Sequence, residues 1–202
     1  MAATGGTSLL LALLAGAMSA AGYAGLVGLP RLGAVAAAEH LVPLDQLALA
    51  PHPGPDWPAV AAALLDGLDL VVVAAPTGDV DATVWRMLAA RARSRGAVLV
   101  STRPWVGCDL TLTVTGHDWA GLGTGQHTGR GRLRGHQMTV RATGRGAAAR
   151  PREVTVPVPL AGRGQLPAGE RPVPVELADA AGRAALSAWR HGRLGAVHGG
   201  SC

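Results

Sequence analysis

Four residue types are missing from this 202-residue sequence, which contains no lysine, isoleucine, asparagine or phenylalanine; all 18 cationic side chains are arginine. The codons of the four missing residues are AT-rich, so the composition indicates a very GC-rich genome. Without lysine, the chain cannot form a Schiff base with a substrate. It also lacks the lysine with which P-loop ATPases bind the β- and γ-phosphates of a nucleotide. Two large classes of chemistry are therefore excluded.

Cysteine is scarce as well: Cys108 and Cys202 are far apart and have no metal-ligand spacing around them. This usage excludes a disulfide scaffold and a zinc site, and it fits a reducing, cytoplasmic compartment. The histidines are not spaced i, i+4 on an expected helix together with a third ligand. We therefore interpret His117, His127 and His136 as surface residues rather than as a metal site. Because no serine or cysteine has a base at a recognisable spacing, no catalytic residue is predicted.

Hydrophobic residues make up 49% of the chain and charged residues 15%, which excludes wholesale disorder and suits one domain plus a tail. The segment Ser8–Ala21 is apolar enough to raise the question of export or membrane anchoring. However, no positive charge precedes it, and several glycines dilute the apolar run that follows. The pattern favours a buried helix and strand, with an exported or membrane-anchored protein as the less favoured alternative.

Charge is distributed unevenly. Residues 1–90 contain two arginines and seven acidic residues, whereas residues 91–202 contain sixteen arginines and six acidic residues. One stretch of 23 residues, 130–152, carries an arginine series and no acidic residue. Arginine matches phosphate bidentately, so the series is a candidate for weak, salt-dependent DNA binding, although a solvated surface explains it equally well. The candidate nucleic-acid-binding residues are Arg130, Arg132, Arg134, Arg141 and Arg145, followed in the series by Arg150 and Arg152.

The first half of the chain alternates between helical and buried-strand patterns. Helices are expected over residues 9–21, 31–40, 58–66 and 79–95, and strands over residues 23–29, 47–50, 68–75 and 97–101. Thr7-Ser8 is the expected N-cap of the first helix. The continuous apolar run at residues 68–75 is typical of a strand in a parallel sheet. The alternation predicts a three-layer α/β domain with a mostly parallel central sheet.

The pattern changes after residue 104. A half-exposed strand is expected over residues 109–115, then a glycine-rich loop, and then antiparallel strands over residues 132–142 and 153–158. Pro157 and Pro159 place the last strand at a sheet edge. The predicted domain is therefore residues 1–160, with an antiparallel β extension from about residue 109.

Residues 161–174 are rich in proline and glycine and are expected to form a linker. A short C-terminal helix, residues 176–191, and a loose tail follow. An apolar helix on a tether suits docking into a partner's groove. Packing of the helix back onto its own domain is an equal alternative. The candidate partner-binding residues are Leu177, Leu186 and Trp189.

Gly5-Gly6-Thr7-Ser8 lies directly before the first expected helix. With the αβ repeat that follows, this segment resembles the phosphate-binding loop of the RecA-like, P-loop NTPase-type ATPase core. The resemblance implies a nucleotide site at these four residues, with Gly6 where the family has lysine. The strand that should precede the loop is missing at Met1. Either the chain begins late, or the sheet lacks a strand and exposes an edge.

Two acidic residues of RecA-like ATPases are also absent. Gly28-Leu29-Pro30 stands where the resemblance implies the acid that activates water, and Ala74-Ala75-Pro76 stands where it implies the Walker B aspartate. Phosphoryl transfer depends on positioning and charge neutralisation, so their loss together with the lysine removes the means of catalysis. The resemblance therefore implies a degenerate site, no enzymatic activity and no bound cofactor. The alternative is a protein that binds NTP and has a DNA-stimulated activity.

More narrowly, the chain resembles the actinobacterial ImuA′ family of RecA-like accessory proteins. Five segments carry this resemblance: GGTSLLLALL at 5–14, PGPDWPAV at 53–60, DLVVV at 69–73, WAGLG at 119–123 and GRGAAARPR at 144–152. The resemblance implies a cytoplasmic accessory of damage-induced translesion synthesis. Its implied partners are a Y-family-like polymerase homologue of the ImuB type, an error-prone replicative-type polymerase and, weakly, DNA.

Overall fold

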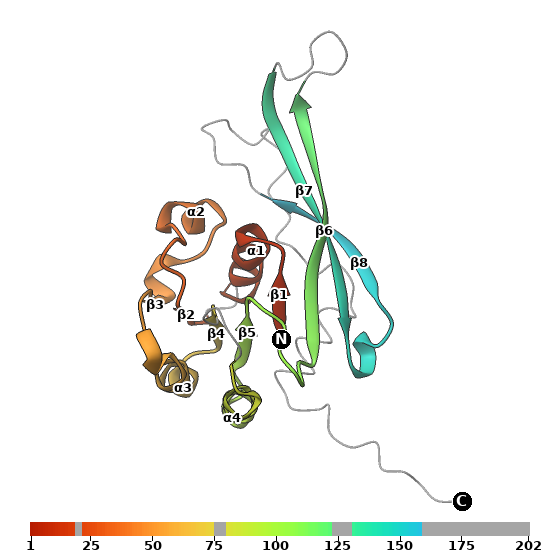
Figure 1. The fold of residues 1–202 in the computed structure, drawn as a ribbon. Coiled ribbons are helices and arrows are strands. Elements are labelled where there is room, and N and C mark those ends of the chain that lie inside the picture. The colour runs from red at the N-terminus through yellow and green to blue at the C-terminus, as the bar shows by residue number, and fades with distance from the viewer. Residues whose placement is uncertain (19–21, 75–79, 123–130, 159–202) are drawn as a thin grey trace, which may run out of the picture.

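The computed structural model describes residues 1–18, 22–74, 80–122 and 131–158. Their strands form one mixed sheet of eight strands in the order β3-β2-β4-β5-β1-β6-β7-β8. Every pairing from β3 to β6 is parallel, and the pairings of β6 with β7 and of β7 with β8 are antiparallel. The expected α/β architecture, a mostly parallel sheet with an antiparallel extension, is confirmed (Figure 1).

The elements alternate along the chain until β5, and three strands then follow one another. The strands are β1 Ala2–Thr4, β2 Ala24–Val27, β3 Leu47–Ala50, β4 Leu70–Val73, β5 Val98–Ser101, β6 Leu110–Leu122, β7 Gly131–Gly144 and β8 Arg152–Val158. The helices are α1 Thr7–Met18, α2 Ala34–Glu39, α3 Trp57–Gly67 and α4 Ala82–Arg95. Short 3-10 turns occupy Leu44–Gln46, Gly54–Asp56 and Gly146–Ala148.

Helices lie on both faces of the parallel strands, α1 and α2 on one face and α3 and α4 on the other (Figure 1). The alternation of side chains along β4 separates the two cores. Leu70 and Val72 belong to the core under α1 and α2, whereas Val71 and Val73 belong to the core under α3 and α4. Because both faces are buried, the strand sequence is continuously apolar.

The expectation that the strand before the glycine-rich turn is missing is wrong. Ala2–Thr4 forms that strand, β1, in the middle of the sheet between β5 and β6. It pairs in parallel with both neighbours, with Ala2 opposite Ser101 on one side and Thr111 on the other. Three small residues carry no recognisable strand pattern, so pairing on both sides rather than propensity determines this strand.

Two other expectations also need correction. Helix α1 begins at Thr7, so Thr7 and Ser8 lie in its first turn and are not its N-cap. The glycine-rich segment expected as a loop from residue 116 continues β6 as far as Leu122, paired with β7. The proline-bearing strand β8 does lie at the sheet edge, as expected.

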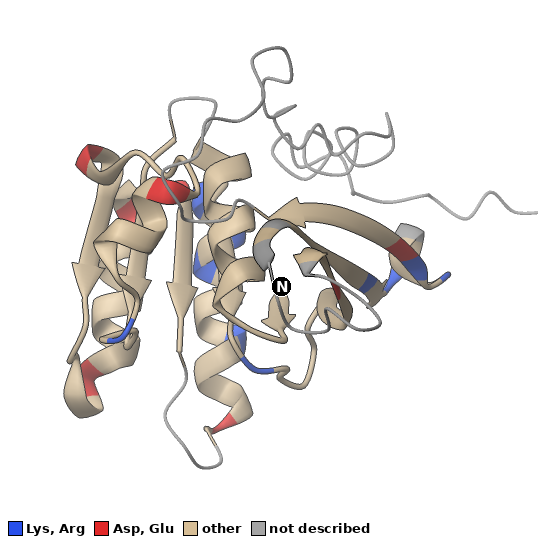
Figure 2. Ribbon diagram, turned by 90° about the horizontal axis from the view of Figure 1, so that it is seen from above, with Lys and Arg blue, Asp and Glu red and all other residues tan. Residues whose placement is uncertain are grey.

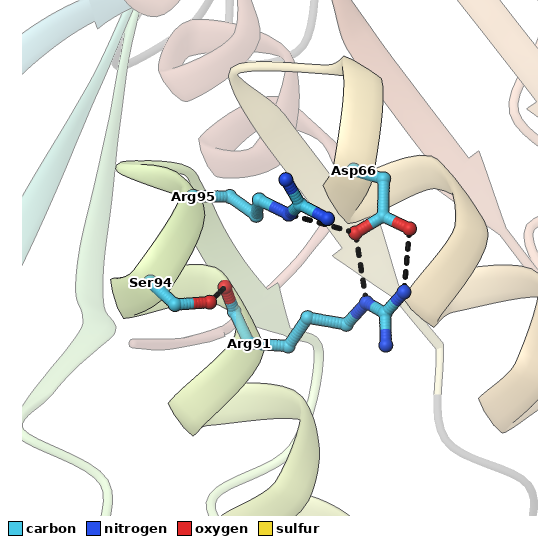
Figure 3. A network of polar contacts seen from close by, with 4 residues as sticks. All are labelled: Asp66, Arg91, Ser94 and Arg95. Atoms are coloured by element: carbon cyan, nitrogen blue, oxygen red, sulfur yellow. Dashed lines mark hydrogen bonds and ion pairs between the residues drawn. The ribbon is translucent and has the colours of Figure 1, made fainter.

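A polar network on the surface joins α3 to α4 (Figure 3). Asp66 on α3 accepts a hydrogen bond from Nε of Arg91 at 2.8 Å and another from Nε of Arg95 at 3.1 Å. The hydroxyl of Ser94 donates to the backbone carbonyl of Arg91. The hydrogen bond from Arg91 is the main reason that the pKa of Asp66 is lowered. These contacts explain part of the arginine content of α4 without a ligand.

Candidate functional site

Of the four residues of the expected phosphate loop, Gly5 and Gly6 form the turn between β1 and α1, and Thr7 and Ser8 begin α1. Gly5 and Gly6 have φ values of +113° and +125°, a region that residues with a Cβ rarely adopt. A Cβ on Gly5 would lie 2.6 Å from Cβ of Val114 on β6, so the turn also requires a glycine for space. Gly5, Gly6 and Thr7 are exposed, and Ser8 is half-buried. The turn therefore presents backbone at the N-terminus of a helix beside the central strand.

The residues that directly follow β2 and β4 are small and uncharged. Gly28 follows β2 with φ +76°, and a Cβ there would lie 2.9 Å from the carbonyl oxygen of Ala74, which follows β4. Residues 75–79 lie outside the described residues. Asp81 is the N-cap of α4, and its Oδ1 accepts a hydrogen bond of 2.8 Å from the backbone N–H of Thr83. This bond lowers the pKa of Asp81 and gives the carboxylate a structural role.

The arginine series divides between the two ends of β7. Arg132 and Arg134 lie near the start of this strand, and Arg130 lies outside the described residues. Arg141 lies near the other end, about 25 Å further along the strand. Arg145, Arg150 and Arg152 gather with Arg141 around the connection from β7 to β8, and all four are exposed. The fold thus produces two basic regions on one hairpin.

Arg141 is not a free cation. Its Nε lies 3.7 Å from Oε1 of Glu153, which stands opposite it on β8. The sequence places Glu153 just beyond the acid-free stretch, and the antiparallel register brings it back to Arg141. Arg145, Arg150 and Arg152 are the exposed arginines around this connection for which no ion pair is found among the described residues. Figure 2 shows several basic residues along α4 and near the β7–β8 connection, whereas acidic residues are spread over both halves of the molecule.

Three aromatic rings meet on β6 and β7, and sequence reasoning missed them. Nδ1 of His117 and Nε2 of His136 are 2.9 Å apart, a hydrogen bond in which one ring donates and the other accepts. The rings of Trp119 and His136 are stacked, with centroids 3.7 Å apart and planes at 3°. We call these three residues the ring cluster.

Within the ring cluster, His136 is buried and Trp119 is 52% exposed. Desolvation lowers the pKa of His136, and the neighbouring His117 lowers it further. The interpretation as a surface residue is therefore wrong for His136, which is buried, whereas His117 is exposed. The nearest signal in the sequence is the i, i+2 spacing of His117 and Trp119, but only the strand register reveals their partner.

The candidate partner-binding residues and one of the histidines cannot be placed in the structure. Leu177, Leu186 and Trp189 lie outside the described residues, as does His127. Within the described ranges, no three histidine, cysteine, aspartate or glutamate side chains converge as a metal site would require. None of the described helices has both the length and the apolar character needed to cross a membrane.

Comparison with known proteins connects the parallel half of the fold to a family. Residues 1–107 match the family model described as the MT3502 N-terminal domain. The chain is also 38% identical, over 146 residues, to the uncharacterized protein Rv3395c of Mycobacterium tuberculosis. This match covers 70% of the chain and 72% of the relative. The chain belongs to the MT3502 N-terminal domain family.

The boundary of the MT3502 N-terminal domain has a structural meaning here. Residues 1–107 contain β1 to β5, the four helices of the described part of the chain and the Gly5-Gly6 turn, and they end just before β6. The arginine series and the ring cluster lie beyond residue 107, on the antiparallel strands. The match to Rv3395c is longer than 107 residues, so it extends into this second part.

Proposed function

We propose that this protein is a non-catalytic, RecA-like accessory of DNA-damage-induced translesion synthesis. It would serve in the cytoplasm as a platform that assembles a Y-family-like polymerase homologue of the ImuB type with an error-prone replicative-type polymerase. The resemblance to RecA-like accessory proteins supplies this role, and the mostly parallel α/β sheet is compatible with it.

One observation carries the proposal. The Gly5-Gly6 turn connects a central strand to a helix N-terminus, which is where a phosphate-binding loop would lie, yet the chain has no lysine to place there. The residues after β2 and β4 are Gly28 and Ala74, neither of which is acidic. A RecA-like ATPase fold without phosphate-binding side chains is expected to bind partners through its surface rather than to hydrolyse a nucleotide.

Partner binding is tested by co-purifying the full chain with a Y-family-like polymerase homologue of the ImuB type. The wild-type protein is expected to retain the homologue, and the double variant Leu186→Ala, Trp189→Ala is expected to lose it if the C-terminal segment is the docking element. The variant Arg150→Gln, which changes an exposed charge in the described domain, is the matched control. Absence of any complex with the wild-type chain would refute the polymerase part of the proposal.

DNA contact is tested separately by retention on DNA at low salt. Replacing Arg130, Arg132 and Arg134 with glutamine is expected to weaken retention and to reduce its salt dependence, because each arginine that contacts phosphate releases counterions. Arg141→Gln is the matched control, since Glu153 already pairs with Arg141. Unchanged retention in the triple variant would mean that these arginines are only solvated.

A second candidate function is NTP binding with DNA-stimulated activity. The exposed backbone of the Gly5-Gly6 turn at the N-terminus of α1 favours it, because backbone N–H groups at such a turn bind phosphate. Equilibrium titration with Mg²⁺-ATP discriminates between the two candidate functions, because only the second requires tight nucleotide binding. We expect no turnover, and Mg²⁺-dependent ATP hydrolysis that stays with the protein after traces of contaminating enzyme are removed would overturn the non-catalytic proposal.

A further inference from the structure

Trp119 is an exposed tryptophan held in one orientation. One face of its indole stacks on His136 at 3.7 Å, and 52% of the residue remains accessible to solvent. His136 is buried and hydrogen-bonded to His117, so the ring that supports Trp119 is itself held in place. A single exposed apolar residue is common on protein surfaces, so the informative feature is the stacking of this ring on a buried, hydrogen-bonded histidine. The cluster therefore presents to solvent an aromatic ring that is supported on one face by His136.

A β-bulge produces this arrangement. Val114 on β6 stands opposite Val140, but the next pair is Gly116 with Thr139, so Thr115 is an extra residue in β6. The insertion exchanges the two faces of the strand. Without it, His117 and Trp119 would lie on the face opposite to Val114. With it, both share the face of Met138 and His136, and the stack becomes possible.

Two arginines come shortly before His136 on β7. Arg134 and Arg132 lie two and four residues from His136 along this strand, on the part of the hairpin that continues past the end of β8 (Figure 1). Asp118 is the nearby acidic residue on β6, and it occupies the alternate position between His117 and Trp119, opposite Gln137. Trp119 stands opposite His136, so Arg134 lies two residues along β7 from its partner, and Asp118 has the register of the other face.

We propose that Trp119, supported by His136, is a stacking platform for a base of single-stranded DNA. Phosphates of the same strand would be bound by the arginines at the start of β7. Single-stranded nucleic acid is bound in this way, by aromatic rings that stack on bases next to cations that follow the backbone. Bases in a duplex stack on one another and have no free face to offer. This inference rests on the DNA contact of the proposed function and narrows it to single strands.

The platform is tested with the full chain and two synthetic oligomers of about 15 residues, oligo-dT and its abasic counterpart. Both carry the same phosphates, but only oligo-dT has bases. The wild-type chain is expected to bind oligo-dT more tightly than the abasic oligomer and the matched duplex. Trp119→Leu keeps an apolar residue on the strand but removes the aromatic face. It is expected to bind oligo-dT about tenfold more weakly, within the range measured for one stacked base, and to bind the abasic oligomer unchanged. Trp119→Phe is expected to keep most of the preference.

Two results would overturn the platform. One is equal binding of oligo-dT by wild type and Trp119→Leu. The other is the same quenching of tryptophan fluorescence by acrylamide in wild type and Trp119→Leu. That second result would mean that another segment of the chain already covers Trp119. Binding of the oligomers is measured without the polymerase, so failure to form the polymerase complex would not contradict the platform. Loss of all DNA binding would end both the platform and the DNA part of the proposed function.

Discussion

The two halves of the sheet are built by different rules. In the parallel half, helices cover both faces, and β4 is apolar at every position. In the antiparallel half, α1 covers one face, where Met138 and Val140 are buried, while the other face is lined by polar residues such as Thr113, Thr139 and Arg141. The platform residue Trp119 shares the face of Met138, but it lies farther along the hairpin, where 52% of the residue is exposed. We therefore place the candidate DNA contacts on the antiparallel half.

The place where the parallel and antiparallel halves of the sheet meet is expected to be the position at which a substitution lowers stability most. Gly5 lies where β1 and α1 meet β6, and a Cβ there would collide with Val114. Gly5→Ala is therefore expected to lower the free energy of unfolding by about 3 kcal/mol, through overpacking and a strained positive φ. Urea denaturation measures the loss. Gly6→Ala is the matched control: its φ is also positive, but a Cβ there meets nothing within 4 Å, so about 1 kcal/mol is expected. Equal losses would show that the halves are not closely packed at Gly5.

A second prediction tests whether the antiparallel half shares the core of α1. Met138 on β7 is fully buried in that core, so Met138→Ala is expected to cost about 3 kcal/mol. Val154 on β8 is 51% exposed, and Val154→Ala is expected to change stability by less than about 0.5 kcal/mol. The measurement is urea unfolding, combined with hydrogen exchange of the amides of α1. If the hairpin folded independently, Met138→Ala would leave the exchange of α1 unchanged.

The same comparison explains what the sequence could predict. The strands of the parallel half carry their own signal, since an apolar run with both faces buried is visible in one dimension. Leu47–Ala50 was expected with its observed bounds, and Leu70–Val73 was expected two residues longer at each end. Strand β1 had no such signal, because Ala2–Thr4 is defined by neighbours about 100 residues away.

The candidate site in the antiparallel half was less accessible from sequence for a different reason. The glycines after residue 116 are typical of a loop, yet pairing with β7 keeps them in a strand. The contact between His117 and His136 depends on the bulge at Thr115, because a shift of one residue would reverse the face of every following side chain. The arginine series could be read from the sequence, but its division between two ends of β7 and the pairing of Arg141 with Glu153 could not.

The ring cluster should make the antiparallel half sensitive to pH. The pKa of His136 is lowered below its ordinary value of 6.5, so the folded state favours the neutral ring. The unfolded chain therefore binds more protons between the lowered pKa and about 6.5, and stability is expected to fall as pH decreases through that window. Urea midpoints measured from pH 7.5 to 5 test this. The variant His136→Gln has no titrating ring at this position, so the pH dependence of its urea midpoint should be flatter. An unchanged slope in this variant would assign the titration to another group.

The smallest effect is expected on the surface of the parallel half. Asp66→Asn removes the charge that Arg91 and Arg95 share between α3 and α4. Because all three side chains are solvent-accessible, the loss of stability should be slight and should disappear at high salt. The pKa of Asp66 is lowered below 3.8, so its contribution is present above that pH and is lost as pH falls further. Asp56→Asn, an equal charge change at an exposed residue that makes no side-chain cap, is the control. A large, salt-independent loss in Asp66→Asn would mean that this half depends on its surface network and not only on its two apolar cores.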